Sequence, residues 1–309
     1  MARTVSVQDV STSLGGVRSE NETTRRRRAA TRKGFKRLLL SVATAALSFV
    51  FVLPFLWMLS TSLKTDPQVY TIPPIWVPSP MRWANYPEAV TYVPFGLYLL
   101  NTLKYCFGTV LGITLSSAFC AYGFSRLQWK GRNVLFFIVL STMMIPFQVR
   151  MIPLYLIFKK IGWLNTYLPL IVPTFTGSAY FIFMLRQFFM TIPSELSDAA
   201  RIDGSSELGI LIRIIMPLAK PALIVVALFT FMDSWNDYMG PLIYLRDTEK
   251  YPIAMGLEQM RAHSMNVTQP LVWPHLMAAS ALVTIPIVFL YFFTQRTFVE
   301  GIALTGVKG

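Results

Sequence analysis

Two stretches of this chain combine side chains that suit reversible binding of a polar ligand rather than covalent catalysis. One stretch follows an apolar run and contains Asp233, Trp235, Asn236, Asp237 and Tyr238. An indole beside Asn and Asp can stack on a sugar ring and hydrogen-bond its hydroxyl groups, and acids near a membrane interior are candidates for function. An aromatic belt at the membrane surface, with solvated acids, also explains this pattern. We select Trp235, Asn236 and Asp237 as candidate substrate-pathway residues.

The other stretch places hydroxyl groups inside a charge-free apolar run, residues 168–185. Its candidate substrate-pathway residues are Thr174, Ser178 and Tyr180. Hydroxyl groups at these positions can line a polar route through a membrane, although Ser and Thr more often join one membrane helix to another. Both explanations stay open at the level of the sequence.

A polar segment, residues 192–217, lies between these two stretches. Residues 168–185 before it and 221–232 after it carry no charge, so this charged segment separates two apolar stretches. Its charged residues are Glu195, Asp198, Arg201, Asp203, Glu207 and Arg213. Charges of both signs need water or a protein partner, because burying an unpaired charge is costly. The polar segment therefore faces solvent or another protein.

The spacing within the polar segment predicts two short helices. Pro193 and Ser194 suit a helix start, and Gly204 can adopt the left-handed conformation that ends a helix. Ser205 or Ser206 can then cap a second helix. The apolar residues of that second helix recur at helical spacing, as Leu208, Leu211, Ile212 and Ile215. Either the chain's own membrane domain or a partner must cover this stripe.

Motifs for catalysis or for binding a cofactor are missing from the sequence. The only histidines, His263 and His275, have no neighbour at the spacing of metal ligands, so we expect no metal site. The chain contains no G-x-x-x-x-G-K-[ST] phosphate loop and no G-x-S-x-G elbow, which excludes nucleotide hydrolysis by the first route and serine catalysis by the second. Cys106 and Cys120 would be about 21 Å apart in a helix, too far for a disulfide. We predict a non-catalytic chain with no cofactor of its own.

The composition is that of an integral membrane protein. The chain has 309 residues, of which 54% are hydrophobic and 14% are charged, whereas about a quarter are charged in soluble domains. The net charge of +13 reflects loop topology, because no basic face with interleaved aromatic residues indicates nucleic-acid binding. We predict an all-α membrane protein with six transmembrane helices, at residues 38–60, 102–124, 134–155, 168–189, 218–238 and 276–297.

Residues 1–37 are predicted to form a disordered basic tail, and residues 38–309 the membrane domain. The tail ends in Arg-rich sequence before an apolar run, a pattern that also resembles a secretory signal. Residues 38–60 are longer than the apolar region of a signal and show no clear cleavage site, so we predict an anchored first span. The third span is predicted to break near Pro146.

The distribution of Lys and Arg predicts which side of the membrane each loop faces. With six spans, 19 of the 28 Lys and Arg residues lie on the side of the N-terminal tail and 9 lie on the other side. Basic residues accumulate in cytoplasmic loops. Both termini and the polar segment are therefore predicted to be cytoplasmic.

The polar segment resembles the EAA loop of ABC importer permeases, written E-A-A-x3-G-x9-I-x-L-P. The matching positions are Asp198, Ala199, Ala200, Gly204, Ile214, Met216 and Pro217. Asp198 stands for Glu and Met216 for Leu, and both changes keep the charge or the apolar character. Residues 37–309 also resemble the smaller, six-span permease subunit of maltose-type sugar importers, in the stretches that begin at Asn101, Ala121, Leu185, Ser234 and Gln295.

The resemblance implies the type I ABC importer permease fold, with the polar segment as a cytoplasmic coupling helix. The residues that it assigns to ATPase coupling are Glu195, Asp198, Ala199, Ala200, Arg201, Asp203, Gly204 and Pro217. It implies a heterodimer with a second homologous permease subunit, and two cytoplasmic ABC ATPase subunits that bind ATP and Mg. An extracytoplasmic solute-binding protein would deliver the carbohydrate and touch residues 239–274. The implied location is the bacterial or archaeal cytoplasmic (inner) membrane, in contact with lipid and not with nucleic acid.

Three alternatives compete with a carbohydrate importer. A stand-alone secondary transporter or channel predicts an internal repeat and coupling-ion acids deep in the spans, whereas this sequence shows no clear repeat and has its acids at span ends. Glycerol phosphates and sugar alcohols are alternative substrates within the ABC family. A membrane scaffold without transport activity is the third alternative.

Overall fold

The computed structural model describes residues 7–264 and 273–306, and these are helices joined by turns and loops, with no strand among them. The chain divides into two compact units, Met1–Met58 and Leu59–Gly309. This all-α architecture confirms the predicted fold class, and Cys106 and Cys120 are both free thiols.

Helix α1 (Val7–Ser62) contains the first candidate span, Gly34–Ser62. It also includes most of the stretch predicted as a disordered tail, which here is helical instead. That stretch is rich in Arg, a residue with high helix propensity, so helix can propagate back from the apolar run. A separate tail domain over residues 1–37 stays a prediction.

The second unit contains the remaining helices. On the N-terminal side of the polar segment they are α2 (Asp66–Val69), α3 (Asn85–Tyr92), α4 (Phe95–Ser125), α5 (Arg132–Ser141), η1 (Thr142–Met144), α6 (Phe147–Lys160), α7 (Leu168–Ile171), η2 (Val172–Thr176) and α8 (Ala179–Thr191). The polar segment holds α9 (Ser194–Ile202), α10 (Glu207–Ile210), the π-helical η3 (Leu211–Ile215) and the start of α11 (Met216–Leu218). Beyond it are α12 (Lys220–Asn236), α13 (Met239–Tyr244), η4 (Thr248–Lys250), α14 (Ile253–Ser264) and α15 (Trp273–Gly306).

Four of the described helical stretches are long and apolar enough to cross a membrane, and two bent pairs bring the total to six. The four single candidates are Gly34–Ser62, Phe95–Ser125, Leu168–Thr191 and Trp273–Gln295. The bent pairs are Arg132–Met144 with Phe147–Lys160, at 98°, and Glu207–Leu218 with Lys220–Asn236, at 81°. Each of the six predicted spans overlaps one of these stretches, and the 98° bend lies at Pro146, where the sequence predicts a break.

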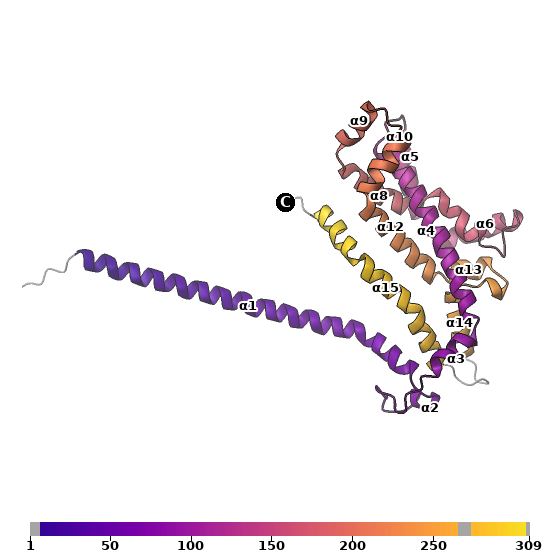
Figure 1. Cartoon of the computed structure of the whole chain (residues 1–309), viewed down its shortest axis with the longest axis horizontal. Coiled ribbons are helices and arrows are strands. Elements are labelled where there is room, and N and C mark those ends of the chain that lie inside the picture. The colour runs from indigo at the N-terminus through magenta and orange to yellow at the C-terminus, as the bar shows by residue number, and fades with distance from the viewer. Residues whose placement is uncertain (1–6, 265–272, 307–309) are drawn as a thin grey trace, which may run out of the picture. The chain divides into compact units, whose positions relative to one another are not determined.

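Helix α4 is the central element of the second unit and packs along α8 and α12. It runs from α3 and α14 at one end to α5 and α10 at the other (Figure 1). One apolar cluster joins α4, α8 and α12 to the polar segment, through residues such as Ala121, Leu185 and Ile215. A second cluster joins α4 to α3, α14 and α15 at the other end.

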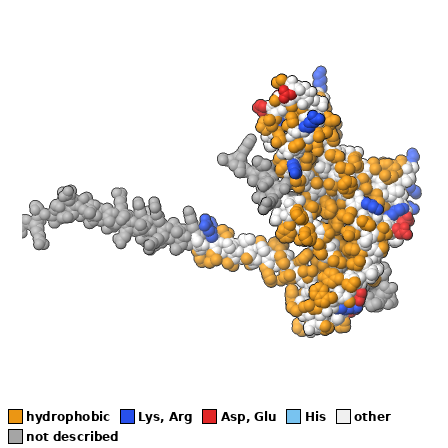
Figure 2. Space-filling model, viewed as in Figure 1, with side chains coloured by type: hydrophobic (Ala, Val, Ile, Leu, Met, Phe, Trp, Pro, Cys, Tyr) orange, Lys and Arg blue, Asp and Glu red, His pale blue; other side chains and the backbone are white. Residues whose placement is uncertain are grey.

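The surface of the second unit is apolar over most of its length. Figure 2 shows hydrophobic side chains across its middle, with Lys, Arg, Asp and Glu toward its margins. Phe137 of α5 is 70% exposed and Met144 of η1 is 85% exposed. Exposed apolar surface on this scale is expected of a protein whose solvent is lipid or whose partner is another membrane subunit.

Candidate functional site

The polar segment, residues 192–217, forms the two helices that its sequence predicts, and we call it the coupling loop. Helix α9 begins at Ser194 after Pro193, and Gly204 follows it with a left-handed φ of +80°. Ser206 then caps α10, because its side-chain oxygen accepts a 3.2 Å hydrogen bond from the Gly209 backbone N–H. The turn chemistry read from the sequence is therefore confirmed at both helix boundaries.

An ionic network on the coupling loop joins α9 to α10. The Arg201 guanidinium donates 2.7 Å hydrogen bonds to Asp198 Oδ1 and to Glu207 Oε1. The hydrogen bond to Glu207 raises the pKa of Arg201 above its already high ordinary value, so the cation is held permanently. The other oxygen of Glu207 accepts a 2.5 Å hydrogen bond from the Tyr122 hydroxyl of α4. Of the predicted coupling residues, Asp198 and Arg201 are brought together directly.

The apolar stripe of the second helix is covered in part by the chain itself. Leu211 and Ile215 are 2% and 0% exposed and belong to the cluster with α4, α8 and α12. Leu208 and Ile212 are 54% and 50% exposed. The chain's own membrane domain therefore covers half of the stripe. The other half stays exposed, where a partner could cover it.

The other predicted coupling residues divide between two faces of the loop. Ala200 is buried against the same apolar cluster, so it anchors α9 rather than offering contact surface. The residues exposed on the outer face are Glu195, Ala199, Asp203, Gly204 and Pro217. Their role in coupling stays a prediction.

A cavity of about 590 Å³ lies between α4, α6, α12, α13 and the α7–η2 segment. Its polar lining residues are Tyr105, Thr109, Arg150, Thr174, Thr230, Asp233, Ser234, Asp237 and Tyr244. Thr174 and Asp237 were selected from the sequence as pathway residues. The others were not selected, although the four-residue spacing of Tyr105 and Thr109 on one helix face is a signal that could have found them.

Two hydrogen bonds tie α4 to α12 and α13 at the wall of this cavity. The Tyr105 hydroxyl donates a 2.7 Å bond to Asp237 Oδ2, and the hydroxyls of Thr109 and Ser234 lie 2.7 Å apart. Asp237 Oδ1 also accepts from the Gly240 backbone N–H at 3.0 Å, at the start of α13. The cavity wall thus contains two hydrogen-bonded pairs of polar side chains that join α4 to α12 and α13.

The remaining predicted pathway residues do not line this cavity. Trp235 is 1% exposed and stacks on Phe231 in the core, with ring centroids 5.2 Å apart. Asn236 points outward and donates a 2.8 Å bond to a carbonyl of its own helix. The backbone N–H of Ser178 donates to the Ser117 hydroxyl, and Tyr180 is 48% exposed. A pathway role for these four stays a prediction.

The histidines and acids show no metal cluster among the residues whose placement is described. His275 lies with Nε2 2.7 Å from Glu88 Oε2. The side chain of His263 lies outside the described residues.

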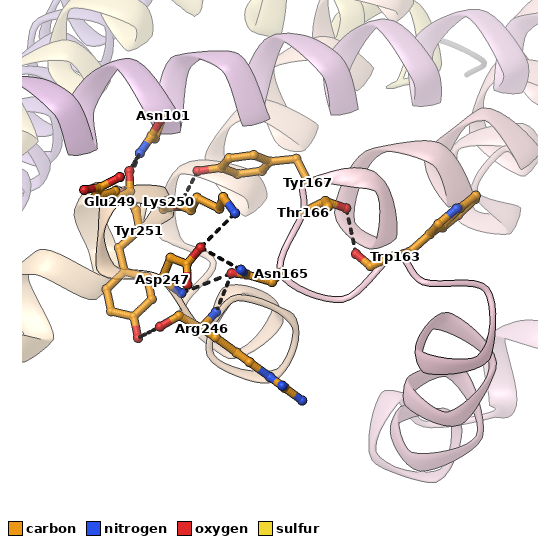
Figure 3. A network of polar contacts seen from close by, with 10 residues as sticks. All are labelled: Asn101, Trp163, Asn165, Thr166, Tyr167, Arg246, Asp247, Glu249, Lys250 and Tyr251. Carbon is orange, nitrogen blue, oxygen red and sulfur yellow. Dashed lines mark hydrogen bonds and ion pairs between the residues drawn. The ribbon is translucent and has the colours of Figure 1, made fainter.

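A polar clasp around Asn165 holds the loop between α13 and α14, and Figure 3 shows Asn165 pointing toward Asp247. The Asn165 Oδ1 accepts 3.1 Å hydrogen bonds from the backbone N–H groups of Arg246 and Asp247. Its Nδ2 donates to Asp247 Oδ2 at 2.7 Å. Tyr167 adds a 2.6 Å bond to the carbonyl of Lys250. This clasp fixes the loop that the sequence associates with a binding protein.

Comparisons with known proteins agree on one family. A family model for the inner membrane component of binding-protein-dependent transport systems matches residues 108–303. The arabinooligosaccharide transport system permease protein AraQ of Halalkalibacterium halodurans is 32% identical, over 88% of this chain and 96% of that protein. The polygalacturonan/rhamnogalacturonan transport system permease protein YtcP of Bacillus subtilis is 34% identical, over 85% and 94%. The sn-glycerol-3-phosphate transport system permease protein UgpE of Yersinia enterocolitica is 33% identical, over 77% and 85%.

Two solved structures share the fold. A chain of a bacterial ABC transporter involved in the import of the acidic polysaccharide alginate superposes with a TM-score of 0.73 and 25% identity, covering 84% of this chain and 95% of that one. A chain of an alginate ABC transporter in complex with an alginate pentasaccharide-bound periplasmic protein gives a TM-score of 0.61 at 15% identity, covering 85% of this chain and 95% of that one. With its apolar helices, its family match and its sequence relatives in agreement, this multi-pass chain belongs to the inner membrane components of binding-protein-dependent transport systems.

Proposed function

We propose that this chain is the permease subunit of an ATP-driven importer and that it moves a carbohydrate across the cytoplasmic membrane by alternating access. The observation that carries the proposal is the coupling loop. Its charged helix α9 is bonded through Arg201 and Glu207 to α4, and α4 lines the polar cavity. The names of its relatives favour an oligosaccharide over other solutes. Import of a glycerol phosphate is the alternative, supported by the third relative.

The proposed energy source is a pair of separate ATPase subunits that bind ATP and Mg. The exposed side chains of α9 and its C-cap include Leu196 and Ile202, 44% and 86% exposed, and the acids Glu195 and Asp203. Such a mixed apolar and acidic surface suits a cleft on a partner, since exposed apolar side chains gain by burial. The sequence itself has no phosphate loop, which agrees with nucleotide hydrolysis by a partner.

The proposed membrane partner is a second homologous permease subunit, forming a heterodimer. The exposed apolar side chains of α5 and η1 supply a surface that lipid or this partner would cover. An extracytoplasmic binding protein would deliver the substrate to the side of the Asn165 clasp. With both termini in the cytoplasm, as the Lys and Arg distribution indicates, the coupling loop and the clasp lie on opposite sides of the membrane.

Transport by the reconstituted complex tests this function. The chain, its partner permease, its ATPase and its binding protein are placed in liposomes and offered labelled arabinotriose, trigalacturonate or sn-glycerol-3-phosphate. We expect ATP-dependent uptake of an oligosaccharide that stops when the binding protein is omitted. Uptake by this chain without any ATPase, driven by an ion gradient, would instead establish a secondary transporter. Absence of uptake and of substrate-stimulated ATPase for every solute would favour a scaffold.

A further inference from the structure

The chain on both sides of α9 is bonded to the last turn of α4 and its C-cap residue. After α9, Glu207 accepts the 2.5 Å hydrogen bond from Tyr122. Before α9, the C-cap residue Arg126 donates to the backbone carbonyls of Phe189 and Ile192, the former at 2.6 Å. Tyr122 and Arg126 are four residues apart and therefore project from one side of α4. The last turn of α4 and its C-cap residue are thus hydrogen-bonded to the chain before and after α9.

The carboxylate of Glu207 connects Tyr122 of α4 to Arg201 of α9. Glu207 receives Tyr122 on Oε2 and Arg201 on Oε1, at 2.5 and 2.7 Å. Arg201 also donates a longer 3.3 Å bond to Oε2, and one carboxylate oxygen can accept more than one hydrogen bond, so the bonds to Tyr122 and Arg201 form together. Hydrogen bonds to a charged group are stronger than neutral ones. A displacement of α9 that moves Arg201 therefore pulls on Glu207, and through it on Tyr122.

The covalent connections of the coupling loop are poorly suited to transmit such a displacement. Between α8 and α9 the chain is extended, with ψ of 132° at Ile192 and 135° at Pro193. Between α10 and α12 the path runs through the π-helical η3 and then bends by 81°. Extended residues and helix bends absorb rotation, as hinges do. The side-chain contacts to α4 bypass both joints.

Helix α4 is one unbroken helix whose middle lines the polar cavity. It runs without a proline from Phe95 to Ser125. Tyr105 and Thr109, which bond to Asp237 and Ser234, lie about 25 Å and about 20 Å from Tyr122 along the helix axis. One unbroken helix therefore contacts the loop at its C-terminal end and the cavity wall along its middle.

We propose that Tyr122 and Arg126 are positioning residues that make α4 the element carrying motion of the coupling loop to the cavity. The inference rests on the proposed function, in which an ATPase moves that loop. The competing explanation is that these bonds only keep the loop folded. The two explanations differ in the number of ATP molecules used per substrate, which a purely structural contact does not change.

The test compares Tyr122→Phe with Tyr98→Phe in the reconstituted complex, using the panel solute that the wild type imports. Both changes delete one hydroxyl from a buried tyrosine of α4. Tyr98 serves as the control because its hydroxyl donates to Gln259 at 3.3 Å, far from the coupling loop. We expect Tyr122→Phe to raise the ATP hydrolysed per solute imported about tenfold, the factor that corresponds to losing about 1.4 kcal/mol of coupling. Tyr98→Phe should leave this ratio at the wild-type value.

A double-mutant cycle provides the second measurement. Because Tyr122 and Glu207 act through one bond, Tyr122→Phe combined with Glu207→Gln should raise the ratio no further than the more severe single change. Additive effects would overturn the proposal. So would an unchanged ratio in Tyr122→Phe, or a parallel loss of ATPase and uptake with a lower melting temperature. Failure of the wild-type complex to import any solute would instead contradict the proposed function.

Discussion

The Tyr105 hydroxyl of α4 donates a 2.7 Å hydrogen bond to Asp237 Oδ2, across 132 residues of sequence. The other oxygen of Asp237 holds the start of α13 through Gly240. One carboxylate thereby connects two elements that line the cavity, α4 and α13.

Tyr105→Phe is predicted to weaken this wall, because it removes the hydroxyl that bonds to Asp237 and keeps the aromatic ring. Loss of a hydrogen bond to a carboxylate should lower the free energy of unfolding by about 2 kcal/mol. We also expect a higher solute concentration for half-maximal uptake, measured in proteoliposomes. A variant with wild-type uptake and wild-type melting temperature would show that the Tyr105–Asp237 bond does not shape the cavity.

Gly112→Ala is predicted to destabilise the packing of α4 on η2. A Cβ at this position would lie 2.2 Å from Thr174 Oγ1 and 2.9 Å from Phe175 Cδ2, so the two elements must separate. Overpacking of this kind costs about 1–3 kcal/mol. Gly123→Ala on the same helix is the matched control, because a Cβ there meets nothing within 4 Å. Thermal unfolding in detergent should separate the two variants, and equal melting temperatures would contradict the close approach.

Substitutions of Gly204 are predicted to separate backbone strain from partner contact. Its φ of +80° is strained for most side chains, although nothing lies within 4 Å of a Cβ. Gly204→Asn should be tolerated, because Asn adopts this conformation more readily, whereas Gly204→Ala should cost about 1 kcal/mol. Gly204→Trp should in addition uncouple ATP hydrolysis from uptake by obstructing the ATPase. Normal uptake by Gly204→Trp would remove this turn from the coupling surface.

Asn165 is predicted to stabilise the clasp in two ways, through the hydrogen bonds of its side-chain amide and through its tolerance of a left-handed backbone conformation. Its φ is +62°, a left-handed conformation that is unusual outside glycine. Asn165→Gly keeps that conformation and removes only the side-chain hydrogen bonds, whereas Asn165→Ala adds about 1 kcal/mol of strain. The Ala variant should therefore expose the α13–α14 loop to proteolysis faster than the Gly variant does. Equal rates would indicate that the backbone strain is negligible.

Glu88 is predicted to make the protein less stable in acid. Hydrogen bonds from His275 and Arg82 hold the pKa of Glu88 below its ordinary value of 4.5. A carboxylate with a depressed folded-state pKa contributes its full stability above 4.5 and loses it as the pH falls through the lowered value. The melting temperature of wild type should exceed that of Glu88→Gln at neutral pH, and the two should converge below pH 4.5. A difference that stays constant with pH would contradict this role.

Local backbone chemistry made the coupling loop predictable from sequence. Gly204 and Ser206 mark a helix end and a helix start through their own conformational preferences, and these depend little on distant residues. The break at Pro146 is equally local, because proline removes a donor from the helix. Helix over most of residues 1–37 was not predicted, because the polar composition of the tail indicates disorder although Arg has a high helix propensity.

The cavity was only partly predictable, and α12 shows why. Ser234 faces Thr109 and lines the cavity, whereas its neighbour Trp235 turns into the core beside Phe231. Consecutive residues on a helix point about 100° apart, so a polar and aromatic cluster in sequence does not share one face. The rotation of α12 about its axis is set by packing against α4 and α15, which the sequence of α12 alone does not contain.

The sequence by itself determined that this is an all-α membrane protein with a charged loop of two short helices, because hydropathy and turn residues act locally. Tertiary structure alone decided that Tyr122 meets Glu207, 85 residues away, and that Tyr105 meets Asp237. Those contacts exist because α4 packs lengthwise between α8 and α12. Their side chains come within hydrogen-bond distance only when three separate helices adopt one mutual arrangement.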